Sequence, residues 1–273
     1  CWLNVFLGQG RASIGFSSFA QIAGSPLRET VEKDYGLVLQ QLQAQAGPAI
    51  QDFDLRFAPK PSCLENMQRV QALTRGWQWE QSPPRKGAHG KNAQGSASGA
   101  RESSKGNLKL TAHFIKSKDQ PKQRDTFCRC QKQRTESYMS AKALIQARKK
   151  SRKVRDSLYR VDAAANEMDT PPEAFAPVFR LSRSHGLSRF TYHVGEDYPH
   201  LLSGLRAVDE ALSFLDLGAG NRLGHATALG MDPETWAHTA GAQVVCPKGE
   251  WMWNMIWLHG RIQEDPVFAH LSA

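Results

Sequence analysis

The sequence predicts an α/β protein in which short strands alternate with helices. Short apolar runs are separated by longer amphipathic stretches, which is the pattern of successive β-α units. Hydrophobic residues make up 40% of the 273 residues, enough to bury a sizeable core. Polar side chains follow several of the apolar runs, as they do at the C-terminal face of a barrel, where active sites are built. A (β/α) barrel is therefore favoured, and a doubly wound sheet is the alternative that periodicity alone leaves open.

Six strands are expected in order along the chain. They span residues 53–58, 108–115, 158–163, 190–194, 222–225 and 242–246. The clearest helix covers residues 203–215, where leucine and valine recur at helical spacing with charged residues on the other faces. Residues 137–156 predict a basic helix, and residues 171–184 predict a helix that opens with prolines.

A stretch rich in Gly, Ser, Pro and charge divides the sequence at residues 81–107 and predicts a flexible linker or insertion. It separates an N-terminal part of the barrel, residues 1–80, from the remaining strands and the polar motifs in residues 108–273. Residues 85–155 contain 20 Lys and Arg against 4 Asp and Glu, in a chain of formal charge +9. A solvated insertion is the simpler interpretation. The other is a surface for phosphates or nucleic acid, although the segment lacks the interleaved aromatics of single-strand binders.

Membrane-spanning and secreted proteins are not indicated. No run approaches the ~20 apolar residues that cross a bilayer, and the start lacks a basic region followed by an apolar stretch. The five cysteines are scattered without a C-x-x-C pair, so reduced thiols and a cytoplasmic location are expected. The first residue is Cys1 rather than Met, which suggests a partial chain.

Two strand ends carry the residue types of a metal-assisted hydrolase. His193 ends an apolar run, Gly195 allows a tight turn, and Glu196 follows three residues after the histidine. An imidazole suits zinc, and a carboxylate that does not bind the metal can move protons between water and substrate. His225 ends the next predicted strand after the helix at 203–215. A single strand-end histidine is more often structural, so the pair is the informative observation.

These motifs resemble those of the adenosine deaminase family. His-Val-Gly-Glu at 193–196 is similar to the family's His-Ala-Gly-Glu, and Arg-Leu-Gly-His-Ala at 222–226 is similar to Arg-Ile/Leu-Gly-His-Gly. Three further segments resemble family strands in the same order: residues 54–59, 161–167 and 244–247. The extended form of the 190–206 segment resembles the large deaminase-like subunit of bacterial antiphage defence systems of the RADAR type more than housekeeping enzymes.

The resemblance implies zinc-dependent hydrolytic deamination of adenosine or an adenine nucleotide to the inosine form. It makes His193 a zinc ligand, Glu196 the acid and base that serves the purine ring, and His225 the residue that orients the attacking water. It makes Ala165 and Asp162 substrate-binding residues, with Ala165 in a turn where the family usually has Gly. The implied cofactor is Zn²⁺. The implied partners are a purine nucleoside or nucleotide, further copies in a homo-oligomer and the ATPase of the defence system, with no membrane.

Two departures from the family pattern lead us to expect an incomplete (β/α)8 TIM-type barrel, about strands 2 to 7. No histidine precedes His89, so the family's His-x-His pair is missing, and no Asp-Asp pair follows the strand expected at 242–246. We therefore expect an internal fragment that is inactive alone, since catalytic zinc needs three protein ligands. The alternative is a non-catalytic deaminase-like scaffold or an RNA-binding subunit. His113 is expected to line the core or a pocket, and the tryptophans at 251–257 to pack against the barrel or a neighbouring subunit.

Overall fold

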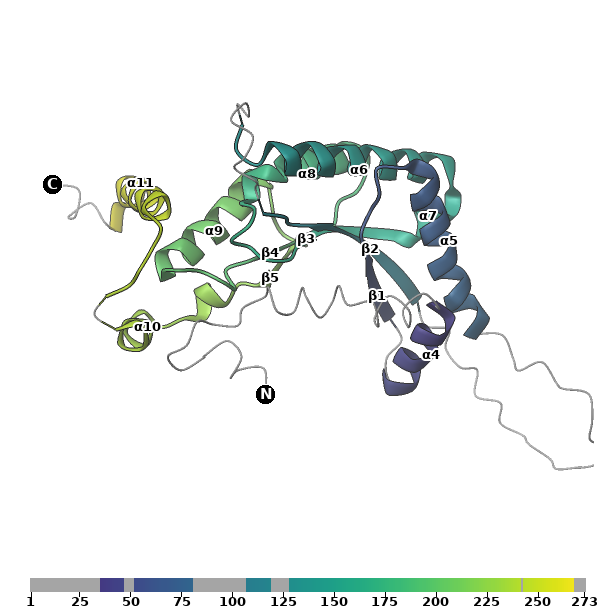
Figure 1. The fold of residues 1–273 in the computed structure, drawn as a ribbon, viewed down its shortest axis with the longest axis horizontal. Coiled ribbons are helices and arrows are strands. Elements are labelled where there is room, and N and C mark those ends of the chain that lie inside the picture. Colours follow the sequence, from purple (N-terminus) through teal and green to yellow (C-terminus); the bar gives the residue numbers. More distant parts are fainter. Residues whose placement is uncertain (1–34, 47–51, 81–106, 119–127, 242, 268–273) are drawn as a thin grey trace, which may run out of the picture.

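The computed structural model describes residues 35–46, 52–80, 107–118, 128–241 and 243–267. They form an α/β fold around a five-stranded parallel sheet that curls into a half-barrel (Figure 1). The strands are β1 (Asp52–Phe57), β2 (Asn107–Ile115), β3 (Leu158–Ala164), β4 (Phe190–Val194) and β5 (Arg222–His225). They lie in the order β1-β2-β3-β4-β5. This order has no reversal, whereas a doubly wound sheet reverses at its switch point.

Five of the six expected strands are confirmed, and the sixth is wrong. Ala242 lies outside the described residues, and residues 243–247 form no strand. Val245 is 93% exposed, and Pro247 has no N–H to donate to a ladder. Apolar residues alone do not make a strand when no neighbouring strand takes up their backbone groups, and this segment pairs with none among the described residues.

Helices follow the strands. They are α4 (Tyr35–Ala46), α5 (Cys63–Glu80), α6 (Gln131–Lys150), α7 (Arg152–Ser157), α8 (Ala176–Ser184), α9 (Leu201–Phe214), α10 (Pro233–Ala240) and α11 (Lys248–Glu264), with 3-10 turns η1 (Pro172–Ala174) and η2 (Thr227–Gly230). The helix expected at 203–215 is confirmed as α9. No helix among these described elements is long and apolar enough to cross a membrane.

Two expected helices are each interrupted. The basic helix at 137–156 is α6 followed by α7, because Ser151 is extended and its hydroxyl accepts a hydrogen bond from the Val154 N–H at 3.4 Å, which begins a new helix. The helix at 171–184 is η1 followed by α8. Pro177 lies in the first turn of α8, and a proline there cannot continue a helix that began earlier.

The sheet has one apolar and one polar face. Alternate strand residues such as Val161, Phe190 and Tyr192 are fully buried against the helices, and Phe179 of α8 stacks on Phe190 with ring centroids 5.1 Å apart. Each such side chain stabilises the fold by about 1.5–3 kcal/mol. The residues between them lie on the other face, because side chains alternate along a strand.

The polar face holds two rows of side chains across the strands. In the row nearer the N-terminal ends of the strands, the Thr111 hydroxyl donates to Asp54 at 2.5 Å, and Arg160 donates to the Thr191 hydroxyl at 2.9 Å. The row nearer the C-terminal ends contains Arg56, His113, Asp162 and His193. Such rows resemble the layers that fill the interior of a barrel.

Candidate active site

The three residues that the sequence assigns to chemistry lie together at the C-terminal end of the sheet. The His225 Nε2 atom lies 3.1 Å from the Glu196 Oε2 atom. The His193 and His225 rings have centroids 5.4 Å apart. Residues 193, 196 and 225 therefore converge at the C-terminal end of the sheet, although the helix α9 separates β4 from β5 in the sequence.

Two glycines allow this convergence. Gly195 adopts a φ of 72°, which favours glycine, and so makes the tight turn that the sequence predicts between His193 and Glu196. A Cβ atom on Gly224 would lie 2.5 Å from the His193 Cδ2 atom. The β5 backbone therefore passes directly against the imidazole of His193, and any side chain at 224 would displace that ring.

Asp162 orients the imidazoles of His113 and His193. Its Oδ1 atom lies 3.0 Å from His193 Nδ1, and its Oδ2 atom lies 3.0 Å from His113 Nδ1 and 3.2 Å from Arg56 Nε. Burial disfavours the charged carboxylate, but hydrogen bonds from His113 and His193 outweigh burial and hold the pKa of Asp162 well below its usual range. An ionised carboxylate only accepts, so each histidine carries a proton on Nδ1, and in the neutral ring Nε2 keeps its lone pair.

Protein donors reach both oxygen atoms of Asp162. The side chain is 0% exposed, and it contacts His193, His113 and Arg56. Its contact with a substrate, which the resemblance implies, stays a prediction. His113 lies beside it with 21% of its side chain exposed.

Glu196 is held in an environment that favours its neutral form. Its side chain is 6% exposed, and burial, with repulsion from Glu167, raises its pKa to about 7 although the nearby His193 opposes this. Burial also lowers the pKa of His225. Both shifts favour the neutral forms of the two groups that meet in the 3.1 Å contact. A carboxyl group with this pKa can both give and take a proton.

Glu167 and Lys116 support the turn that carries Glu196. The Glu167 carboxylate accepts hydrogen bonds from the backbone N–H groups of Gly195 at 3.0 Å, Glu196 at 2.8 Å and Asp197 at 3.3 Å. Lys116 is buried, and its Nζ atom donates to the His193 carbonyl at 2.6 Å. Burial lowers the pKa of Lys116 to about 8. Neither role could be predicted from the sequence: Lys116 follows its strand as any charged residue does, and Glu167 ends the 161–167 segment without a pattern that indicates its contacts.

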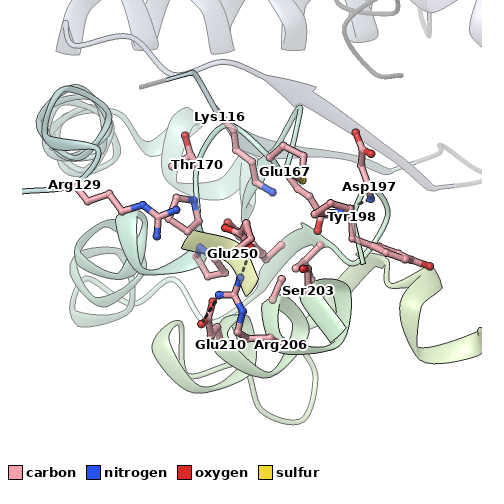
Figure 2. A pocket seen from close by; sticks show the side chains of 17 residues that line it. Lys116, Arg129, Glu167, Thr170, Asp197, Tyr198, Ser203, Arg206, Glu210 and Glu250 are labelled. Atoms are coloured by element: carbon pink, nitrogen blue, oxygen red, sulfur yellow. Dashed lines mark hydrogen bonds and ion pairs between the residues drawn. The ribbon is translucent and has the colours of Figure 1, made fainter. Parts of the chain in front are cut away.

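A small cavity lies behind the site, on the helix side of β4. Figure 2 shows Lys116, Glu167 and Asp197 among the residues that line it. Its volume of about 60 Å³ has room for a few water molecules and not for a purine. Arg206 crosses it to Glu210 at 2.8 Å. The cavity is therefore too small for a purine, and the His193, Glu196 and His225 side chains lie outside its lining.

Ala165 begins the loop after β3 with a φ of 94°, a conformation that favours glycine. The backbone at Ala165 therefore has the shape that Gly would select. A non-glycine residue in this region carries strain on the order of 1 kcal/mol.

The described residues do not make a complete zinc site. His193 has the arrangement typical of a metal ligand, since a carboxylate fixes its Nδ1 atom and leaves Nε2 free. However, the described residues contain no group of three His, Cys, Asp or Glu side chains that could hold a metal ion. A catalytic zinc needs three protein ligands, so the described residues do not fit the metal by themselves.

No protein-family model and no curated protein sequence matches the chain. The fold and the site geometry are therefore the basis for a functional assignment.

Proposed function

We propose that this chain carries the proton-transfer part of an adenosine-deaminase-like site on part of a (β/α)8 barrel. The main supporting observation is the contact of 3.1 Å between Glu196 and His225 beside His193, with the pKa of Glu196 raised to about 7. The chain order of the parallel strands and the polar C-terminal end of the sheet support the barrel. The reaction class is hydrolytic deamination of an adenine nucleoside or nucleotide.

In this reaction water adds to the amino-bearing carbon of the purine and ammonia leaves. Glu196 in its neutral form donates a proton to the adjacent ring nitrogen, which makes that carbon more electrophilic. The resulting carboxylate takes one proton from the attacking water and passes it to the leaving amine. As ammonia departs and the carbonyl forms, the remaining hydroxyl proton returns to Glu196 and restores its neutral form. His225, neutral at pH 7 because its pKa is lowered, accepts a hydrogen bond from the attacking water and orients it. Zinc, which the family resemblance implies, requires ligands from beyond the described residues.

The test is ammonia release from adenosine and adenine nucleotides by the protein expressed from its complete reading frame. Glu196→Gln keeps the shape and removes the exchangeable proton, so kcat should fall by about 10²- to 10⁴-fold. Glu210→Gln is the matched control, because Glu210 is also a partly buried carboxylate with a raised pKa, yet it bonds Arg206 on the helix side. Equal activity of the wild type and Glu196→Gln would contradict the proposal.

Metal content gives an independent check. Because the described residues supply one suitable imidazole, the 273-residue chain should bind less than one equivalent of zinc after dialysis and release no ammonia from adenosine. Elemental analysis measures the zinc. One tightly held equivalent, lost in His193→Ala, would show that the ligand set is complete within this chain.

A second candidate function is binding of single-stranded nucleic acid at the opposite end of the sheet. Three cations surround the Tyr159 ring at the start of β3: Arg189 at 4.6 Å, Lys109 at 5.0 Å and Arg160 at 5.6 Å from its centroid. Arg189 is exposed and makes no ion pair with a described residue. The exposed cations of α7 precede this strand directly. Cations beside an aromatic ring suit phosphates and stacked bases.

Fluorescence anisotropy with a labelled single-stranded RNA tests this second candidate. Arg189→Glu should weaken binding about 3- to 10-fold and reduce the salt slope by roughly 1, as expected for one lost phosphate contact. Lys132→Glu is the control, because Lys132 lies at the other end of the basic helix α6. RNA binding that does not change with salt concentration, or an equal loss of affinity in both variants, would exclude RNA binding at the surface around Tyr159.

A further inference from the structure

The Glu167 carboxylate is bound by three successive backbone N–H groups, from Gly195, Glu196 and Asp197. Consecutive N–H groups that point to one anion form a concave binding site called a nest, and the positive φ of Gly195 turns the backbone into this shape. Here the anion is a side chain of the same protein, supplied from 28 residues earlier in the chain. The nest therefore joins the loop after β3 to the loop after β4.

Lys116 lies near the Glu167 side chain. It comes from the end of β2, donates to the His193 carbonyl at 2.6 Å, and lies 4.4 Å from the centroid of the Tyr192 ring. Burial raises the pKa of Glu167, while the backbone N–H groups and the positive charge of Lys116 oppose this, and both side chains line the cavity in Figure 2. The ends of three strands thus meet around one carboxylate.

We propose that Glu167 is a positioning residue, whose carboxylate fixes the 195–197 backbone and so directs the Glu196 carboxyl toward His225 and the substrate. This inference rests on the proposed role of Glu196. The bonds to the backbone of Glu196 itself and of both neighbours leave the turn little freedom to rotate. Glu167 acts through Glu196, since its two oxygen atoms face the backbone N–H groups and not the polar sheet face.

Glu167→Gln tests the inference because it keeps the size and loses one acceptor. An amide presents one oxygen and one NH₂ group, and the NH₂ group would meet an N–H group where a carboxylate oxygen accepted. Hydrogen exchange at the amides of 195, 196 and 197 should become at least 10-fold faster, while exchange in β3 and α9 stays unchanged. In the deamination assay kcat should fall about 10²-fold with KM nearly unchanged, as expected for a misplaced catalytic group.

Two further variants make the result decisive. Glu210→Gln removes a carboxylate that lines the same cavity without touching the turn, and it should change neither exchange at 195–197 nor kcat. Glu167→Asp keeps the charge on a shorter side chain, serves if Glu167→Gln does not fold, and should recover part of both losses. Unchanged exchange at the three amides in Glu167→Gln, or an equal effect of Glu210→Gln, would overturn the inference.

The two hypotheses remain separable. Faster exchange at 195–197 in a protein that deaminates no purine would support the positioning role and contradict the proposed reaction. Deamination that falls in Glu196→Gln and not in Glu167→Gln would support the reaction and contradict the positioning role.

Discussion

The middle of the polar sheet face and its C-terminal end both pair a carboxyl group with imidazoles, yet they hold the carboxyl group in opposite states. In the middle, two imidazoles and Arg56 surround Asp162, and its pKa is held well below the usual range. At the end, Glu196 contacts one imidazole, and its pKa is raised to about 7. Both side chains are buried, at 0% and 6% exposure, so burial alone does not decide the outcome. The number of hydrogen-bond donors that reach the carboxylate decides whether its pKa is lowered or raised.

Removing the ionised carboxylate should have the largest effect on stability. Asp162→Asn removes the charge and replaces one of the two accepting oxygen atoms with an NH₂ group, so at least one of the three donors loses its acceptor. Breaking a buried charge network of this kind costs about 3 kcal/mol. Because the folded pKa is depressed, Asp162 stabilises the fold above its unfolded pKa of about 3.9 and loses this contribution as pH falls further. Urea unfolding at pH 7 and pH 3 measures both. Asp54→Asn, at a 38% exposed side chain, should cost far less, and equal costs would contradict the account.

Neutralising Glu196 should raise the stability of the fold, whereas neutralising Asp162 should lower it. The folded pKa of Glu196 is raised, so its ionisation opposes folding as pH rises from about 4 through 7. Glu196→Gln stays neutral and should therefore stabilise the fold at pH 8 by on the order of 2 kcal/mol, while kcat in the deamination assay falls by about 10²- to 10⁴-fold. The gain should vanish below pH ~4, where Glu196 is protonated in both states. Destabilisation at pH 8 would mean that the ionised form is the one the fold favours.

A smaller effect is expected where β5 passes the imidazole of His193. Gly224→Ala places a methyl group 2.5 Å from the ring, which costs about 1 kcal/mol after the gain in backbone entropy. The ring must move, so kcat should fall more than stability does. Gly218→Ala is the control, because a Cβ atom there meets nothing within 4 Å. Equal kcat values for Gly224→Ala and Gly218→Ala would contradict a close approach of the Gly224 backbone to the His193 ring.

Five strands could be predicted because their apolar and polar residues alternate and each ends in a turn. The segment at 243–247 has similar residues but no neighbour to pair with among the described residues, and composition does not report pairing. The interruption of the basic helix at Ser151 depends on a single hydroxyl that caps a new helix. The helical pattern of the sequence continues on both sides of Ser151, so it does not indicate that one helix ends and another begins there.

His193, Glu196 and His225 could be found from the sequence because each follows a strand in a short motif. The contacts that support them could not, since every supporting side chain comes from a distant part of the chain, and the family resemblance makes Asp162 only a substrate-binding residue. Lys116 bonds a residue 77 positions later, and Asp162 bonds His113 and His193 from 49 and 31 positions away. Parallel strands bring these residues together only after the sheet has formed.

The most direct test is the titration of the Glu196 carboxyl carbon by ¹³C NMR, assigned by its absence in Glu196→Gln. We expect a midpoint near pH 7. A midpoint near 4.3, the ordinary value for glutamate, would contradict the account, because an always-ionised Glu196 could not donate the proton that deamination requires.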